Sequence, residues 1–182
     1  VEGAPSAAAF PNPPYTTLER TPVSREKPYL FVDSAGQWQV RIPYAASGTR
    51  GVSWSAGPTP GRTVPLSDFH VVHPGDAWSS INSALAQGKS LLFTPGLYDV
   101  ARSIRVTRPG TVVLGMGHAT LTAVGGATPL VVEDRAGIVV AGLTIDAGST
   151  ESSALLTVGA SPAQGQGPSG RPDVSTSTDP LT

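Results

Sequence analysis

The chain has 182 residues, is 39% hydrophobic and carries a formal net charge of −1. This charge offers no electrostatic reason to expect a nucleic-acid or anionic-membrane partner. No apolar run reaches the roughly 20 residues that span a bilayer, and the absence of Cys excludes disulfides and thiolate metal sites.

The first third of the chain predicts a linker followed by a hairpin. Residues 1–24 are rich in proline, which favours extended structure. Within a connector at residues 25–72, Tyr29–Val32 and Gln37–Ile42 flank an Asp-Ser-Ala-Gly turn, as expected for a hairpin. The second strand alternates strictly, so we expect one buried face made of Trp38, Val40 and Ile42.

A short helix is predicted next, over residues 76–88. Its apolar residues Trp78, Ile81 and Leu85 lie on one helical face, with Asp76 as N-cap and Gly88 as the stop. A helix just before the first strand of a solenoid would cover the open end of its core. The alternative is an ordinary surface helix.

Residues 88–148 contain short β-branched strands with little room for helices between them. Three similar units, each an apolar triplet followed by Gly or Pro, start at Leu92, Val113 and Val139. A repeat of about 20–30 residues with two or three strands is typical of a solenoid. We therefore predict an all-β fold, a right-handed parallel β-helix with an N-terminal cap helix. The expected strands are 91–93, 103–106, 111–114, 119–122, 129–132, 137–140 and 143–145.

We assign the cap helix and first coils to residues 73–159 and a flexible Gly, Pro and Ser loop to residues 160–182. A cap is expected at one end only, and three coils leave an exposed strand edge after Leu155–Val158. The sequence therefore predicts an internal fragment whose β-helix is completed by the remainder of a parent protein or by a complementary chain.

Several motifs carry a family resemblance. The segments 81–85, 91–98, 104–106 and 112–117 resemble the opening of a pectate-lyase-type β-helix, with its apolar-x-Pro-Gly-x-Tyr strand and apolar-Gly-x-Gly turn. Residues 25–147 are also similar to large secreted actinobacterial proteins. Their architecture resembles the tandem β-helices of glycoside hydrolase family 55, which act on β-1,3-glucans. The resemblance implies a secreted, extracellular protein with a polysaccharide substrate.

Candidate substrate contacts are few. Asp146 follows a strand where solenoid enzymes often place substrate contacts, Glu151 lies nearby, and Trp54 is a loop aromatic on which a sugar could stack. A turn-capping role for Asp146 is favoured, as is a solvated turn with a local ion pair for Glu133–Asp134. Glycoside hydrolysis needs two carboxyl groups, so we expect the catalytic pair to lie outside this chain.

Other motifs are interpreted as structural. His70 and His73 flank extended residues and point to opposite faces, and His118 is remote, so no metal site is expected. Residues 115–120 lack the third glycine and the helix of a dinucleotide loop, and no cofactor is expected. Arg102, Arg105 and Arg108 form a basic strip, best explained as a solvated strand face, with sugar or phosphate contact as the alternative.

Two functions remain open at this point. The first is a segment of a glycoside hydrolase acting on a glucan, with polysaccharide lyase chemistry less favoured because no dense acidic cluster suggests Ca²⁺. The alternative is a non-catalytic β-helix module for carbohydrate binding, structure or adhesion. Neither involves nucleic acid or a membrane.

Overall fold

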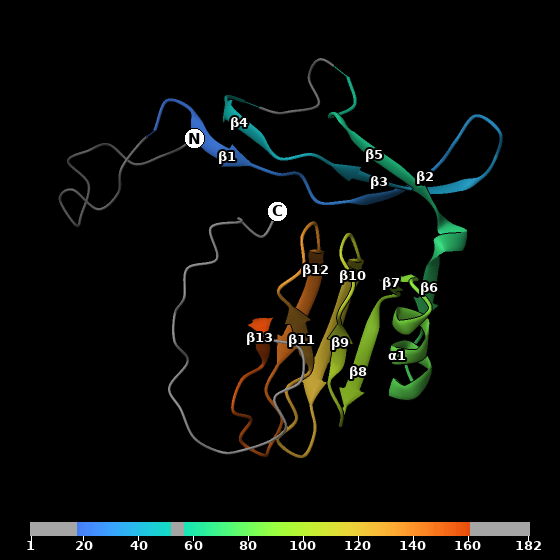
Figure 1. The fold of residues 1–182 in the computed structure, drawn as a ribbon, viewed down its shortest axis with the longest axis vertical. Helices are drawn as coiled ribbons and strands as arrows, with labels where there is room; N and C mark the ends of the chain where they lie inside the picture. Colours follow the sequence, from blue (N-terminus) through green and yellow to red (C-terminus); the bar gives the residue numbers. More distant parts are fainter. Residues whose placement is uncertain (1–17, 52–56, 161–182) are drawn as a thin grey trace. The chain divides into compact units, whose positions relative to one another are not determined.

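The computed structural model describes residues 18–51 and 57–160, drawn in colour in Figure 1. The chain divides into two compact units, one comprising residues 1–26 and 43–62 and the other residues 27–42 and 63–182. In the first unit, β1 (Thr21–Ser24) pairs antiparallel with β4 (Ala46–Thr49). The Nε of Arg25 donates to the carbonyl of Pro43 at 2.9 Å. Burial, and then the charge of Arg62, lower the pKa of Arg25.

The second unit contains a parallel β-helix, which confirms the predicted fold class. One sheet stacks β6 (Phe69–Val72), β7 (Ser90–Phe93), β10 (Val112–Ala123) and β12 (Val139–Asp146), with β8 (Gly96–Val100) also pairing with β10. A second sheet stacks β9 (Ile104–Val106), β11 (Leu130–Glu133) and β13 (Leu156–Ala160). All pairings within these two sheets are parallel. In Figure 1 the successive coils follow one another from β6 and α1 on the right to β12 and β13 on the left.

The stack differs from the sequence prediction in its start and its register. The strand β6, assigned above to the connector, pairs with β7 and forms the lowest coil. The expected equivalence of Leu92, Val113 and Val139 is wrong by one residue, because Val113 pairs with Leu91 and Val139 pairs with Val112. A slip of one residue exchanges the two faces of a strand. The repeat motif therefore aligned Val113, which points into the interior, with Leu92 and Val139, which point outward.

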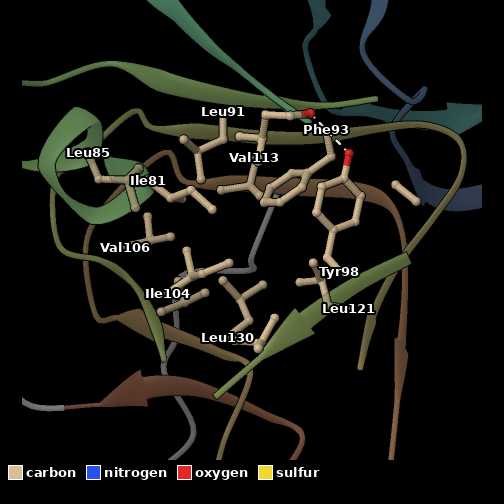
Figure 2. Close-up of a cluster of buried hydrophobic side chains, with 14 of the residues drawn as sticks. Ile81, Leu85, Leu91, Phe93, Tyr98, Ile104, Val106, Val113, Leu121 and Leu130 are labelled. Atoms are coloured by element: carbon tan, nitrogen blue, oxygen red, sulfur yellow. Dashed lines mark hydrogen bonds between the residues drawn. The ribbon is translucent and has the colours of Figure 1, made fainter. Parts of the chain in front are cut away.

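The interior of the β-helix is filled by aliphatic and aromatic side chains, shown in Figure 2. Phe93 and Tyr98 meet edge to face with centroids 5.1 Å apart. The Tyr98 hydroxyl lies 3.0 Å from the carbonyl of Val72 and 2.7 Å from that of Thr94, so its polar atom is satisfied inside the core. Leu91, Val113, Leu121 and Leu130 are fully buried.

A second apolar cluster lies on the outer side of the large sheet. Here β2 (Tyr29–Val32) pairs antiparallel with β3 (Trp38–Pro43), and β5 (Gly61–Pro65) extends the sheet before the 3-10 turn η1 (Leu66–Asp68) and β6. The predicted hairpin is confirmed, and Val40 and Ile42 pack among outward residues such as Leu92, Leu114 and Val139. Trp38 is 54% exposed, so its predicted burial is wrong.

The hairpin turn is organised by one carboxylate. Asp33 Oδ1 accepts hydrogen bonds from the backbone amides of Ala35 and Gln37, and its Oδ2 accepts one from Gln39, each at 2.9 Å. These bonds, the one from Gln37 first, lower the pKa of Asp33. An Asp in this position mimics a backbone turn and fixes the hairpin register.

The cap helix α1 (Trp78–Ala86) lies at the end of the stack next to β6 and β7 (Figure 1), packed mainly against β9, β7 and β6. Ile81 and Leu85 point into the core as predicted (Figure 2). Gly88, at φ +88°, ends the helix, with hydrogen bonds from Gly88 N to Leu85 O and from Lys89 N to Ala84 O. This is the Schellman pattern, in which glycine takes the left-handed position.

The start of the helix differs from the prediction. Ala77 is the N-cap residue and no side chain caps it. Asp76 instead accepts a hydrogen bond from the amide of His73 at 2.9 Å, closing the preceding turn. Trp78, expected to cover the core, is 41% exposed.

The turn within the long strands requires glycine. A side chain at Gly115 would collide with the carbonyl of Gly142 in the coil above, and one at Gly142 would meet the carbonyl of Gly115 and the Lys27 side chain. The two backbones therefore approach more closely than any residue with a Cβ would permit. The pairing register of β10 and β12 shifts between Leu114 and Ala119, the segment that contains Gly115, and pairing continues on both sides of it.

Candidate functional site

A mostly polar surface, here called the polar face, lies on the outer side of β8 and of the second halves of β10 and β12. The strand register places its residues in two columns that cross the coils. Every second residue along each strand points outward, while Tyr98, Leu121 and Ile145 point into the core. The two columns are Leu97, Thr120 and Thr144, and Asp99, Thr122 and Asp146.

The second column carries the chemistry of the polar face. Asp99 and Asp146 lie on either side of Thr122, and since strands are about 4.8 Å apart their backbones are separated by about 10 Å. Both carboxylates are exposed. Their oxygens, with the hydroxyls of the threonines, can accept and donate hydrogen bonds to a neutral polyhydroxylated ligand. An acid of glycoside hydrolysis is usually shielded from water in an apolar pocket, whereas both of these carboxylates are exposed to solvent.

The structure places the three predicted contact residues separately. Asp146 ends β12, and its Oδ1 accepts a hydrogen bond from the amide of Ala147 at 2.9 Å, consistent with the turn-capping role that the sequence favoured. Glu151 lies exposed in the loop that follows, where its carbonyl approaches Gly126. Trp54 lies outside the described residues. No contact joins Asp146 and Glu151 among the interactions of the described residues.

Asp99 was not predicted from the sequence as a site residue. It follows Tyr98, one strand residue beyond the Pro-Gly-x-Tyr motif, and it pairs with Thr122, which pairs with Asp146. The signal was present, because an Asp directly after a buried Tyr in a strand points to the opposite face. Finding it required the exact register between coils, which the repeat alone did not provide.

Glu133 is not the solvated turn residue that the sequence predicted. It is 6% exposed at the end of β11. Its Oε2 lies 3.3 Å from Nη2 of Arg135, and its Oε1 lies 3.9 Å from Nη2 of Arg105 on the neighbouring strand β9. The predicted local ion pair is present, and burial makes it a structural element of the second sheet rather than a free carboxylate.

The basic strip is only partly a solvated face. Arg102 lies over the ring of Trp78, 4.9 Å from its centroid, and Arg105 faces Glu133. His70 is partly buried and His73 exposed, with Nδ1 of His73 3.9 Å from Asp76. Across residues 18–51 and 57–160 no group of three His, Asp or Glu side chains could hold a metal ion. No helix in the same ranges is long and apolar enough to cross a membrane.

Comparison with protein families and curated proteins identifies related chains. The profile of the LAM55 pectate lyase-like domain matches residues 69–180. An exo-beta-1,3-glucanase from Streptomyces sp. (strain SirexAA-E / ActE) is 49% identical over 165 residues, which are 91% of this chain and 27% of that protein. The chain thus spans about a quarter of the length of this relative.

Solved structures give the same relationship. The structure of sacteLam55A from Streptomyces sp. SirexAA-E superposes with a TM-score of 0.78 at 48% identity, covering 91% of this chain and 30% of that one. A variant of sacteLam55A in complex with glucose has a TM-score of 0.78 at 49% identity, covering 87% and 28%.

Proposed function

This chain belongs to the LAM55 pectate lyase-like domain family, and from that membership we propose that it forms the capped end of a β-helix in a glycoside hydrolase acting on β-1,3-glucan. The observation that carries the proposal is the 49% identity to an exo-beta-1,3-glucanase along 91% of the chain. Identity of this extent covers the connector and hairpin as well as the β-helix coils.

In this proposal the chain contributes structure and substrate contacts, and the acid and base of hydrolysis lie in other parts of the protein. The polar face supports this division. Its two aspartates are exposed, about 10 Å apart along the stack, and one of them caps a turn. The polar face is therefore better suited to holding sugar hydroxyls than to cleaving a glycosidic bond.

The substrate partner is a neutral glucan rather than a uronate polymer. Lyase chemistry on uronates uses acidic Ca²⁺ ligands and a basic residue near the scissile bond. The described part of the chain holds no cluster of three metal-ligating side chains. We further propose secretion as the location, since a polysaccharide substrate is extracellular, and completion of the β-helix by other parts of the same protein.

The test is a hydrolysis assay of the full-length protein that carries this chain. We expect glucose or short oligosaccharides to be released from a soluble β-1,3-glucan, with little release from an α-1,4-glucan and no unsaturated product from polygalacturonate. Binding of β-1,3-glucan without hydrolysis by a folded protein would favour the non-catalytic carbohydrate-binding module. An unsaturated product would contradict the proposal in favour of a lyase.

A further inference from the structure

A cavity of about 210 Å³ opens at the capped end of the β-helix, under strand β8. The helix α1 packs mainly against β9, β7 and β6, and β8 pairs only with β10 in the described ranges. The cavity therefore lies along the edge of β8 that has no partner strand in the described ranges. Five lining residues that are at most 5% exposed form an apolar floor, namely Ile81, Phe93, Tyr98, Val100 and Ile104. Five exposed lining residues form the rim, namely Gly75, Asp76, Trp78, Leu97 and Asp99.

The rim contains an exposed aromatic ring, that of Trp78, on which a ligand could stack. Trp78 occupies an apolar position of the helix, yet it is 41% exposed at the cavity mouth. The guanidinium of Arg102 lies 4.9 Å from its centroid and restrains the ring from one side. Such a cation–π contact at an exposed site contributes about 0.5–1 kcal/mol, which suffices to bias the ring orientation. The ring is thus oriented before any ligand arrives.

The rim also contains two carboxylates on opposite elements. Asp99 comes from β8 and makes no side-chain hydrogen bond or ion pair with another described residue. Asp76 comes from the turn before α1, and its Oδ2 accepts a hydrogen bond from His73 N, which fixes the carboxylate and leaves Oδ1 available. Asp99 therefore offers two oxygen acceptors and Asp76 one, beside an aromatic face and an apolar floor.

This combination selects one class of ligand. The two carboxylates disfavour an anionic ligand such as a uronate, and the Arg102 guanidinium on Trp78 disfavours a cation at the ring. A neutral sugar ring matches both halves of the cavity, because its C–H face stacks on an aromatic ring and its hydroxyls donate to carboxylates. The volume lies below the about 300–1,000 Å³ of pockets for drug-sized ligands, which fits one ring rather than a chain.

We propose that this cavity binds a single neutral glucopyranose unit, with Trp78 as the stacking residue and Asp99 and Asp76 as hydroxyl acceptors. The choice of glucose over other neutral hexoses rests on the proposed function. The preference for a neutral sugar rests only on the residues that line the cavity. The site is separate from the polar face except for Leu97 and Asp99, which lie on the edge strand shared by both. A terminal unit of a glucan held here would anchor the polymer at the capped end.

The experiment follows the Trp78 ring itself. The full-length protein is labelled with 5-fluorotryptophan, and the Trp78 resonance is identified by its absence in Trp78→Phe. Glucose and laminaribiose, the β-1,3-linked disaccharide, are titrated in turn, with galacturonate as the anionic control. We expect a saturable shift of the Trp78 resonance with both glucosyl ligands and none with galacturonate.

Two aspartate variants make the result specific. Asp99→Asn should weaken the fitted affinity about tenfold, since a hydrogen bond to a charged acceptor is replaced by a neutral one. Asp134→Asn, an exposed aspartate outside the cavity, should leave the affinity unchanged. Unaltered melting temperatures establish that both variants are folded.

The outcomes separate this inference from the proposed function. Absence of a saturable shift, or an unchanged affinity in Asp99→Asn, overturns the cavity site. Hydrolysis of β-1,3-glucan by the same preparation is measured independently. Hydrolysis without a Trp78 shift would leave the proposed function intact and remove the site, while a shift without hydrolysis would keep the site and contradict the enzyme.

Discussion

At the scale of single residues, the carboxylates of this chain have different roles because their surroundings differ. Glu133 is almost fully buried between two arginines, Asp33 is held by backbone amides in a hairpin turn, and Asp146 is exposed beside its own turn. Burial and hydrogen-bond partners thus decide which carboxylate stabilises the fold and which is available to a ligand.

Asp146→Asn should reduce the activity of the full-length protein only modestly. The amide keeps one oxygen acceptor for Ala147 N and for a sugar hydroxyl, so we expect kcat/KM on β-1,3-glucan to fall less than about tenfold. The melting temperature and Asp134→Asn serve as controls. A loss above about 10³-fold in a folded variant would show that Asp146 belongs to the acid–base pair, since general acid–base catalysis alone contributes about 10²–10⁴-fold.

The Glu133 cluster should respond unequally to removal of its partners. Arg135→Ala removes the nearer cation and the bond from its Nε to the carbonyl of Thr107, leaving a buried carboxylate with Arg105 at 3.9 Å. We expect a loss of about 1–3 kcal/mol in the free energy of unfolding. Glu133→Gln removes the buried charge and leaves two arginines that are partly exposed to water. We therefore expect it to lower the free energy of unfolding less than Arg135→Ala does. Denaturant unfolding of both variants measures the two losses. A larger loss for Glu133→Gln than for Arg135→Ala would contradict the view that Arg135 stabilises the buried Glu133 carboxylate.

The residue scale also shows what the sequence could not predict. Strict alternation predicted burial for Trp38, Val40 and Ile42, and it is correct for the two that lie over the large sheet. Trp38 lies near the start of β3, where it is 54% exposed. Periodicity gives the face of a strand but not how far the covering surface extends. Asp99 was missed for a related reason, because its alignment with Asp146 depends on pairing between coils.

At the scale of elements, the cap helix connects local sequence to the solenoid core. Its spacing of apolar residues and its glycine stop were readable in the sequence, and its role as a cap is confirmed by the buried positions of Ile81 and Leu85. The N-terminus of the helix was not predicted correctly, because Asp76 accepts a hydrogen bond from His73 N and closes the preceding turn instead of capping the helix. Local polar contacts that compete with a cap are decided by turn geometry.

Leu85→Ala should destabilise the β-helix substantially, because the side chain is 4% exposed within the interior cluster. Truncation of a buried leucine costs about 2–5 kcal/mol through lost burial and the cavity that remains. Gln87→Ala, at the exposed end of the same helix, should cost less than about 1 kcal/mol. Thermal and denaturant unfolding compare the two. Equal, small losses would indicate that the helix lies on the surface and does not cap the core.

At the scale of the whole β-helix, the two ends differ. The lower end is covered by α1, apart from the cavity below β8, whereas the outer edges of β12 and β13 have no partner strand in the described part of the chain. Leu156 and Val158 pair with Leu130 and Val132 and so occupy inward positions. They are 43% and 42% exposed, while their counterparts one coil below are 0% and 1% exposed. Core positions of the upper coil are therefore exposed to solvent.

This upper surface predicts the behaviour of the 182-residue chain expressed alone. Open strand edges with exposed apolar side chains favour pairing with other chains, and coils need stacked neighbours to bury their interior faces. We expect concentration-dependent association in sedimentation velocity experiments. Leu156→Lys should reduce it without lowering the melting temperature, since the lysine ammonium would lie in water and repel a second edge. Trp38→Lys, an exposed change on the hairpin, is the matched control and should leave association unchanged. A stable monomer across the concentration range would show that this surface is covered by part of the chain itself.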